Sequence, residues 1–280
     1  MQPPESLPDK SLARRSFAAA AASYDGAAVL QQEIGRRLLE RLDLVRLRPQ
    51  RILDLGAGTG QCLPGLLRRY RGAEVVALDI ALPMLQRARA RGRWLRRPRC
   101  VCADAERLPF ADARFDLVFS NLMLQWSLDI EAAFRELQRI LRPGGLLLFT
   151  TFGPDTLHEL RDSWGQADGY SHVNAFADMH DLGDALVRSR FADPVMDVER
   201  LTVTYPDLGK LMRELKQIGA HNVTAGRPRG LTGKGRLRRL ESAYERYRRD
   251  GVLPASYEVV YGHAWATSCE TSIPLESLRR

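Results

Sequence analysis

A glycine-rich stretch that follows a short apolar run is the part of the sequence best suited to bind a ligand. The segment 51–60, RILDLGAGTG, places Asp54 before three glycines that alternate with small residues. An apolar run stopped by glycines predicts a buried strand that ends in a tight turn. Glycine lets the backbone adopt positive φ and lets a ligand lie against it. The helix expected over 61–70 would offer unpaired N–H groups at its start.

The spacing of the glycines narrows the class of ligand. The order is G-x-G-x-G, whereas a dinucleotide fingerprint is G-x-G-x-x-G and holds a pyrophosphate at the helix end. A P-loop is excluded because no Gly-Lys-Ser/Thr follows. The D-x-G-x-G-x-G pattern resembles motif I of the methyltransferases that use S-adenosyl-L-methionine (SAM), where the glycines approach the amino acid part of the cofactor. The alternative for such a loop taken alone is a tight turn between a strand and a helix.

The next apolar run ends in an acid at a spacing that suits a ribose. The segment 74–79, EVVALD, is a second expected strand, and its last residue is Asp79. In a Rossmann-like unit, an acid roughly twenty residues after the loop accepts hydrogen bonds from ribose hydroxyls. For Asp79 alone, the alternative is an acid that favours the N-terminus of the helix expected over 81–91. The loop and Asp79 together favour a SAM-type site.

Two further expected strands end in polar residues that would face the same site. Asp104 and Ala105 follow a short strand expected over 100–103, and they could bracket an adenine, with the acid accepting from its exocyclic amine. The alternative for Asp104 is an ordinary helix or loop acid. Asn121 ends the strand expected over 115–121. Ligands of open α/β sheets lie outside the carboxyl ends of the strands, so this edge would face the cofactor and the transferred methyl group.

Strands and helices alternate regularly through residues 50–152, which predicts a parallel sheet. An amphipathic helix is expected over 130–141, a turn over 142–145 and an apolar strand over 146–152. The order DLGAGTG, ALD, AD, FDLVFSN and LRPGG-LLLFTTF is similar to that of class I SAM-dependent methyltransferases. The resemblance implies an α/β, Rossmann-like fold with a seven-stranded, mostly parallel sheet. It also implies SAM as the cofactor, bound by Asp54, Gly56, Ala57, Gly58, Gly60, Asp79, Ile80, Asp104, Ala105 and Asn121.

Several stretches outside these motifs point to one family. They are NLMLQW at 121–126, HVNAF at 172–176, LKQIGAHNVTAGR at 215–227 and an N-terminal F-x-x-A-A-x-x-Y that ends at Tyr24. With these, residues 16–266 resemble the malonyl-acyl-carrier-protein O-methyltransferases of biotin synthesis. The resemblance implies methylation of the free carboxylate of a malonyl thioester on acyl carrier protein. The resulting ester disguises the malonyl group as an elongation substrate for fatty acid synthesis.

The chemistry of this reaction decides which residues are candidates. A carboxylate has a pKa of about 4 and is ionised at neutral pH. It is therefore already a nucleophile, so we expect no general acid or base. Catalysis rests on in-line placement and on a cation or several donors that hold the anion. No metal is expected, although His180 lies in the sequence DMHD. The substrate-positioning candidates are Tyr24, Gln125, Trp126, His172, Asn174 and Arg227, and each has a structural role as its alternative.

The N-terminal region is expected to be helical after a short tail. Residues 1–10 contain three prolines and are expected to be a disordered tail. Residues 11–280 are expected to form a single methyltransferase domain. Its first part, 11–45, is expected to be helical, with a break at Asp25-Gly26. This part is either a packing element or a lid over the cofactor with Tyr24 pointing into the site.

A helical insert is expected at about 206–252, between strands expected over 194–205 and 257–266, which the resemblance implies are antiparallel neighbours. The insert combines a helix, a basic glycine-rich loop over 226–236 and a charged helix over 237–249. Its charges suit an acidic carrier protein, whose association they would accelerate in a salt-dependent manner. The alternative is a solvated helix face. The candidate docking residues are Arg229, Lys234, Arg236, Arg238 and Arg239.

Composition excludes several other classes of protein. The 280 residues are 45% hydrophobic, which suits one large α/β domain, and no run of 18 apolar residues predicts a membrane helix. The net charge of +8 comes mainly from arginine, a bias that reflects either genome composition or an acidic partner. The basic residues are scattered and form no nucleic-acid-binding motif, so no nucleic acid partner is expected. The four cysteines form no C-x-x-C pair and no signal peptide is evident, which favours reduced thiols in the cytoplasm.

Two other functions stay open at this point. An enzyme that modifies protein side chains, similar to the respiratory complex I assembly factors, would share the GPDTLHELR stretch at 153–161. The intact HVNAF and IGAHNVTAGR stretches disfavour it. A non-catalytic binding protein on a degenerate methyltransferase fold is disfavoured by the intact glycines and by Asp79.

Overall fold

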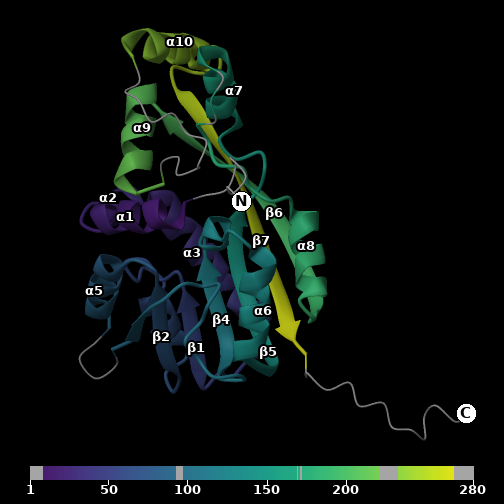
Figure 1. Ribbon diagram of the computed structural model, residues 1–280. Coiled ribbons are helices and arrows are strands. Elements are labelled where there is room, and N and C mark those ends of the chain that lie inside the picture. The colour runs from purple at the N-terminus through teal and green to yellow at the C-terminus, as the bar shows by residue number, and fades with distance from the viewer. Residues whose placement is uncertain (1–8, 93–96, 169, 171, 221–232, 268–280) are drawn as a thin grey trace, which may run out of the picture.

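The computed structural model, which describes residues 9–92, 97–168, 170, 172–220 and 233–267, is centred on one seven-stranded sheet (Figure 1). The strand order is β3-β2-β1-β4-β5-β7-β6; the first five strands in this order are parallel, and β7 is antiparallel to both β5 and β6. The winding reverses between β1 and β4, and such a point opens a crevice at the carboxyl ends of the strands. The strands are β1 (Arg51–Leu55), β2 (Glu74–Asp79), β3 (Arg99–Cys102), β4 (Phe115–Asn121), β5 (Leu141–Phe152), β6 (Phe191–Tyr205) and β7 (Leu253–Ala266).

Helices cover both faces of the sheet, because side chains alternate along each strand. In β1, Ile52 packs in one core cluster with Leu38 of α3, whereas Leu53 packs in another with Phe134 of α6 and Leu182 of α8. The helices are α1 (Lys10–Ala20), α2 (Tyr24–Ala27), α3 (Val29–Arg41), α4 (Leu63–Arg69), α5 (Leu82–Ala90), α6 (Ile130–Ile140), α7 (His158–Ala167), α8 (Met179–Arg188), α9 (Leu208–Gln217) and α10 (Lys234–Glu245), with 3-10 turns η1 (Leu42–Leu44) and η2 (Leu124–Trp126).

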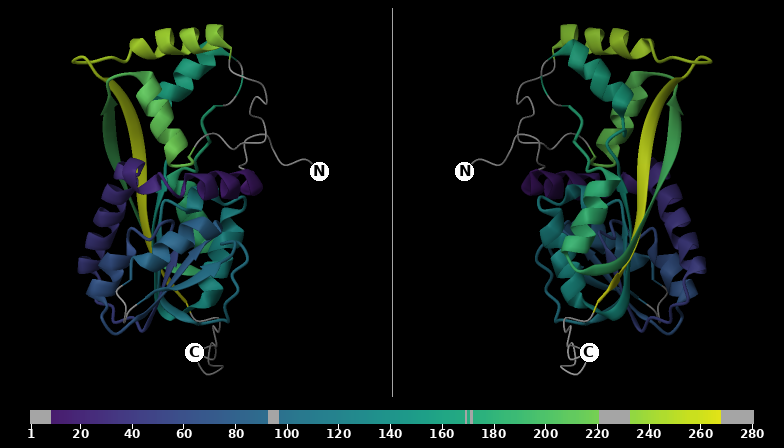
Figure 2. Two further views of the ribbon diagram at one scale, coloured as in Figure 1. Left: turned by 90° about the vertical axis from the view of Figure 1, so that its left-hand side faces the viewer. Right: turned by 90° about the vertical axis from the view of Figure 1, so that its right-hand side faces the viewer.

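The two longest strands, β6 and β7, extend beyond the body of the sheet and carry an upper part (Figure 1, Figure 2). There α7, α9 and α10 surround the strand ends. Tyr205 of β6 and Tyr257 of β7 are buried in the same cluster as Trp164, Leu211 and Leu240 from these three helices. The upper part is therefore packed on the strands of the main sheet.

The N-terminal helices α1 and α2 lie between the body of the sheet and α9 (Figure 1). The hydroxyl of Ser16 donates to the carbonyl of Gly219 at 3.0 Å, and the hydroxyl of Ser23 donates to the carbonyl of Gln217 at 3.1 Å. Both bonds tie the N-terminal helices to the end of α9. In the part of the chain that the structure describes, no helix is both long and apolar enough to cross a membrane.

The predicted fold class and strand pairing are confirmed, and the differences lie at element boundaries. The expected tail ends earlier than predicted, because Asp9 caps α1 by accepting from the N–H of Leu12 at 3.0 Å. The predicted break at Asp25-Gly26 is wrong, since both residues belong to α2 and the chain turns at 21–23. Residues 1–8 of the expected tail lie outside the described residues.

Several boundaries in the second half also differ from the prediction, and β6 and β7 begin at Phe191 and Leu253 rather than at 194 and 257. Residues 142–145 are part of β5 rather than a separate turn, although Gly144 has a φ of 74° and the register with β4 shifts there. Helix α10 begins at Lys234, after an extended Gly233, and not at 237. Arg227 and Arg229 of the expected basic loop lie outside the described residues.

Candidate active site

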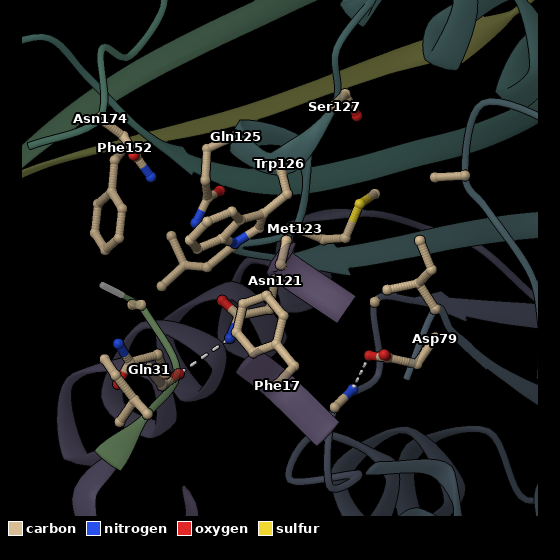
Figure 3. Close-up of a pocket in the computed structure, with 18 of the residues that line it drawn as sticks. Phe17, Gln31, Asp79, Asn121, Met123, Gln125, Trp126, Ser127, Phe152 and Asn174 are labelled. Atoms are coloured by element: carbon tan, nitrogen blue, oxygen red, sulfur yellow. Dashed lines mark hydrogen bonds between the residues drawn. The ribbon is translucent and has the colours of Figure 1, made fainter. Parts of the chain in front are cut away.

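A pocket lies beyond the carboxyl ends of β1, β2 and β4, where the topology predicts a ligand site (Figure 3). Its empty space is about 1250 Å³, which includes space open to solvent. The glycine loop and the ends of β2 and β4 line one end. Side chains of α1, α9 and the segment 174–176 line the rest. The pocket thus joins the body of the sheet to the upper part.

The three glycines of the loop have different reasons to be glycine. All have positive φ, at 71° for Gly56, 55° for Gly58 and 81° for Gly60. A Cβ on Gly56 would meet the side chain of Met123 at 2.3 Å, and one on Gly60 would meet backbone of α5 at 2.9 Å. A Cβ on Gly58 would meet nothing within 4 Å, and Gly58 lines the pocket. Only Gly58 therefore keeps ligand space open.

Asp79 fixes the shape of the loop from the end of β2. Its carboxylate accepts the backbone N–H of Gly58 at 2.9 Å (Figure 3) and that of Ala81 at 2.8 Å. Burial raises the pKa of Asp79 above its usual value, although these backbone bonds act in the opposite direction. Asp79 and its neighbour Ile80 line the pocket, and each carboxylate oxygen retains a second lone pair for a ligand hydroxyl.

Asp54 lies in β1 behind the loop and does not line the pocket. It is buried, and its Oδ2 has no hydrogen-bond partner among the described residues. Burial, and after it the negative charge of Asp79, raise the pKa of Asp54 to about 7. Ala57 and Gly60 are likewise absent from the lining. Asp54, Ala57 and Gly60 were predicted to contact the cofactor, but none of them lines the pocket, so they support the shape of the loop instead.

Asp104 and Ala105 line the pocket beyond the end of β3, and Asp104 has a partner that the sequence did not indicate. The ammonium group of Lys10 donates to its two oxygens at 2.8 and 2.7 Å and also contacts Glu106 at 2.6 Å. Lys10, Ala13 and Phe17 lie at helical spacing on α1 and all line the pocket. Helix α1 therefore covers the pocket and is fastened by an ion pair.

Tyr24 lies at the same end of the pocket, at the start of α2. Burial, and after it the negative charge of Asp79, raise the pKa of its phenol, which therefore stays protonated at neutral pH. The next residue, Asp25, holds α2 on the loop by accepting from Thr59 at 2.5 Å and from Gln61 at 3.0 Å.

Asn121 lines the pocket at the end of β4, but its amide is used within the protein. Its Nδ2 donates to the carbonyl of Gln31 at 3.0 Å (Figure 3), and its Oδ1 accepts from Thr150 at 2.8 Å. These bonds hold α3 against the sheet. Gln125 and Trp126 follow on η2, and the rings of Trp126 and Phe17 form a T-shaped pair with 5.0 Å between centroids.

The opposite end of the pocket is apolar, and sequence reasoning missed most of it. Phe152 ends β5, Phe176 packs against it with 5.7 Å between ring centroids, and Tyr257 of β7 packs at 5.6 Å. Leu215 and Ile218 close this end from α9 and the residue that follows it. The helical spacing of apolar residues in α9 was the available signal, but it did not show which cavity they face. Asn174 is the polar residue that the segment 174–176 adds here.

Two other predicted residues do not reach the pocket as the structure describes it. His172 is absent from the lining and instead contacts Asp168 and Trp164. Arg227 lies outside the described residues. His180 is 79% exposed and pairs with Asp178 of its own helix cap.

Known proteins are similar to this chain in both sequence and fold. Residues 53–149 match the family model described as a methyltransferase domain. The chain is 56% identical over 259 residues to the malonyl-acyl-carrier-protein O-methyltransferase of Halorhodospira halophila, covering 92% of this chain and 88% of that protein. It is 52% identical over 274 residues to the protein of the same name from a Methylovorus species, covering 96% and 93%. The solved structure of YcgJ from Bacillus subtilis has the same fold, with a TM-score of 0.61 at 16% identity, covering 83% of this chain and 99% of that one.

Proposed function

The chain belongs to the family of malonyl-acyl-carrier-protein O-methyltransferases, and we propose that it methylates the free carboxylate of a malonyl thioester carried by an acyl carrier protein. The methyl donor is SAM, and the product is the malonyl methyl ester with which biotin synthesis starts. One observation carries the proposal. A single pocket connects a glycine loop and the acid Asp79 at the end of β2 to an apolar end that also holds side-chain amides.

The residues present fit SAM at the glycine-loop end. Gly58 leaves open the space that a Cβ would fill, and Asp79 offers two half-buried acceptors to the ribose hydroxyls. Asp104 and Ala105 lie where an adenine would be bracketed, with Met84 on the neighbouring helix. Asp54 has a buried oxygen without a partner in the described part of the chain, which suits an indirect contact with the ammonium group of SAM.

When bound, SAM supplies a methyl group on a positively charged sulfur that leaves as a neutral thioether. The substrate carboxylate is ionised at neutral pH, so the chain needs no general base. Its residues instead exclude water and align the carboxylate oxygen with the methyl carbon. Trp126 and Phe17 form an apolar wall between the two ends of the pocket, and Phe152 lines the apolar end. Tyr24, Gln125 and Asn174 can donate hydrogen bonds there without adding a cation that would weaken the nucleophile.

Methyl transfer from labelled SAM tests this function. Malonyl-carrier protein should accept the label, whereas acetyl-carrier protein, which lacks the free carboxylate, should not. Equal labelling of both would contradict the proposal, and so would no labelling of either by a protein that binds SAM. An enzyme that modifies protein side chains is not favoured, since the relatives reported above carry the name of the malonyl enzyme.

The ion pair at α1 supports the role of this helix as a cover of the cofactor. Replacement of Lys10 by methionine removes the contacts with Asp104 and Glu106 but keeps the length of the side chain. We expect the dissociation constant of SAM to rise about fivefold. Partly exposed ion pairs contribute little free energy, and a larger change in affinity is therefore not expected. Titration calorimetry measures the change. Lys210→Met, on an exposed position of α9, is the matched control. Unchanged SAM affinity in Lys10→Met would contradict the role of α1 as a cover of the cofactor.

We place the docking surface for the acidic carrier on α10. Lys234 and Arg238 are exposed and have no ion pair or hydrogen bond with any described residue. Leu237 between them is 43% exposed. Their spacing puts all three on one face of the helix. Two other predicted docking residues are used internally, since Arg236 faces Asp168 at 3.7 Å and Arg239 donates to the carbonyl of Ala167 at 3.0 Å.

Reversal of both free charges tests the docking surface. The double variant Lys234→Glu/Arg238→Glu should lower kcat/KM for malonyl-carrier protein about tenfold at low salt, because electrostatic steering is lost. The difference should shrink as salt is added. Activity on malonyl-pantetheine, which has no carrier protein, should be unchanged.

The matched control is Arg46→Glu/Arg68→Glu, which makes the same charge change at exposed positions in the body of the molecule. Equal losses in the two double variants would show a general charge effect and overturn the docking surface.

We also propose a cytoplasmic location, which the free thiols of Cys62, Cys100 and Cys102 support.

A further inference from the structure

A cluster of side chains outside the pocket fastens the segment that carries Asn174. The ring of His172 stacks on the ring of Trp164 in α7, with 3.6 Å between centroids and 9° between planes. Its Nε2 lies 2.8 Å from Oδ1 of Asp168, just after the end of α7. The side chains of His172 and Asp168 are only 11% and 8% exposed. His172 therefore holds the chain at two points, by its face and by its edge.

Asp168 contacts several members of this cluster at once. Its carboxylate also accepts the N–H of Tyr170 at 3.0 Å and faces Arg236 of α10 at 3.7 Å. Burial acts to raise its pKa, but the hydrogen bonds from Tyr170 and His172, with the charge of Arg236, keep that pKa below its usual value. Asp168 is thus a carboxylate at neutral pH, so Nε2 of His172 must be the donor in their bond.

Beyond this anchor the chain enters the pocket within two residues. Val173 is buried, Asn174 lines the pocket, and Phe176 packs on Phe152. Figure 3 shows the amide groups of Asn174 and Gln125 directed into the same end of the pocket, next to Phe152. Oδ1 of Asn174 has no hydrogen-bond partner among the described residues. This acceptor is therefore not used within the described part of the protein, and the NH₂ group of the same amide can donate to a ligand.

We propose that His172 is a positioning residue that, by stacking on Trp164 and by its hydrogen bond to Asp168, holds the amide of Asn174 where it binds the malonyl thioester together with Gln125. The inference rests on the proposed function, because it names the group that the two amides bind. Neutral amide donors suit this task, since they hold a carboxylate without the full charge of a cation. His172 acts on the substrate only through Asn174.

A double-mutant cycle separates this role from a general structural one. His172→Phe keeps a flat ring for Trp164 but cannot donate to Asp168, and Asn174→Ala removes the amide. With malonyl-pantetheine as substrate, each variant should lower kcat/KM about tenfold, the expected effect of one hydrogen bond. The double variant should fall no further than either one, because both changes remove the same contact. SAM affinity should stay within about twofold of the original.

Two further variants complete the test. His172→Gln, whose amide can still donate to Asp168, should recover part of the activity lost in His172→Phe. His180→Phe, at an exposed position outside the pocket, is the control and should match the unmodified protein. Losses that multiply in the double variant, or weakened SAM binding in His172→Phe, would overturn the proposal. Absence of any malonyl methylation by the unmodified protein would instead refute the proposed function, so the two failures are distinguishable.

Discussion

Replacement of Asp79 by asparagine is expected to raise the dissociation constant of SAM about 100-fold, the loss of two hydrogen bonds to a charged acceptor. The carboxylate accepts the N–H groups of Gly58 and Ala81 at once. An asparagine has one oxygen and one NH₂ group, so one of these backbone donors would face another donor. The loop would lose its shape, and the ribose would lose an ionised acceptor. Titration calorimetry with SAM measures the effect.

The control for this variant is Asp184→Asn, which makes the same chemical change at an exposed position of α8 outside the pocket. It should bind SAM as the unmodified protein does. Thermal unfolding of Asp79→Asn shows whether the variant is folded. A folded Asp79→Asn protein with SAM affinity within about threefold of the original would contradict the assignment of the cofactor end.

Replacement of Gly58 by valine is expected to abolish SAM binding. Two effects act together at this position. A β-branched residue is strained at a φ of 55°, by about 1–3 kcal/mol. In addition, the new side chain would enter space that is open in the pocket, since a Cβ at this position would meet nothing within 4 Å. The second effect blocks the ligand directly.

Gly144→Val separates the two effects. Gly144 has a φ of 74° and equally open surroundings, but it is exposed in β5 and does not line the pocket. This variant should unfold at a lower temperature and still bind SAM. Gly58→Val should lose stability to a similar extent and lose SAM binding as well. Retained binding in a folded Gly58→Val protein would show that the cofactor does not lie against this glycine.

Local patterns in the sequence were sufficient to predict the parallel half of the fold and the acid at its ligand-binding edge. Asp79 could be placed at this edge because its position depends on strand end and spacing, which a sequence shows directly, and the structure shows that it ends β2 and lines the pocket. The antiparallel pairing of the strands expected over 194–205 and 257–266, on either side of the insert, came from the family resemblance and is confirmed. Local periodicity alone does not show which strands pair across such a distance.

The residues that sequence reasoning missed depend on long-range contacts. Lys10 was placed in a disordered tail because of the nearby prolines, and its partner Asp104, 94 residues further along the chain, gives no local signal. Leu215 was recognised only as part of an amphipathic helix, since periodicity shows that a face is buried but not what it covers. His172 was predicted at the substrate, yet its ring stacks on Trp164 outside the pocket. A motif can show that a histidine matters without showing which way it points.

The position of the methyl group on the product tests the central claim most directly. The protein is incubated with methyl-labelled SAM and malonyl-carrier protein, and the acyl group is analysed by mass spectrometry and mild alkaline hydrolysis. The account predicts one added methyl group on the malonyl moiety, released by alkali as methanol, because the ionised carboxylate oxygen is the nucleophile. A label that resists alkali, or that lies on the carrier polypeptide, would contradict methylation of the malonyl carboxylate.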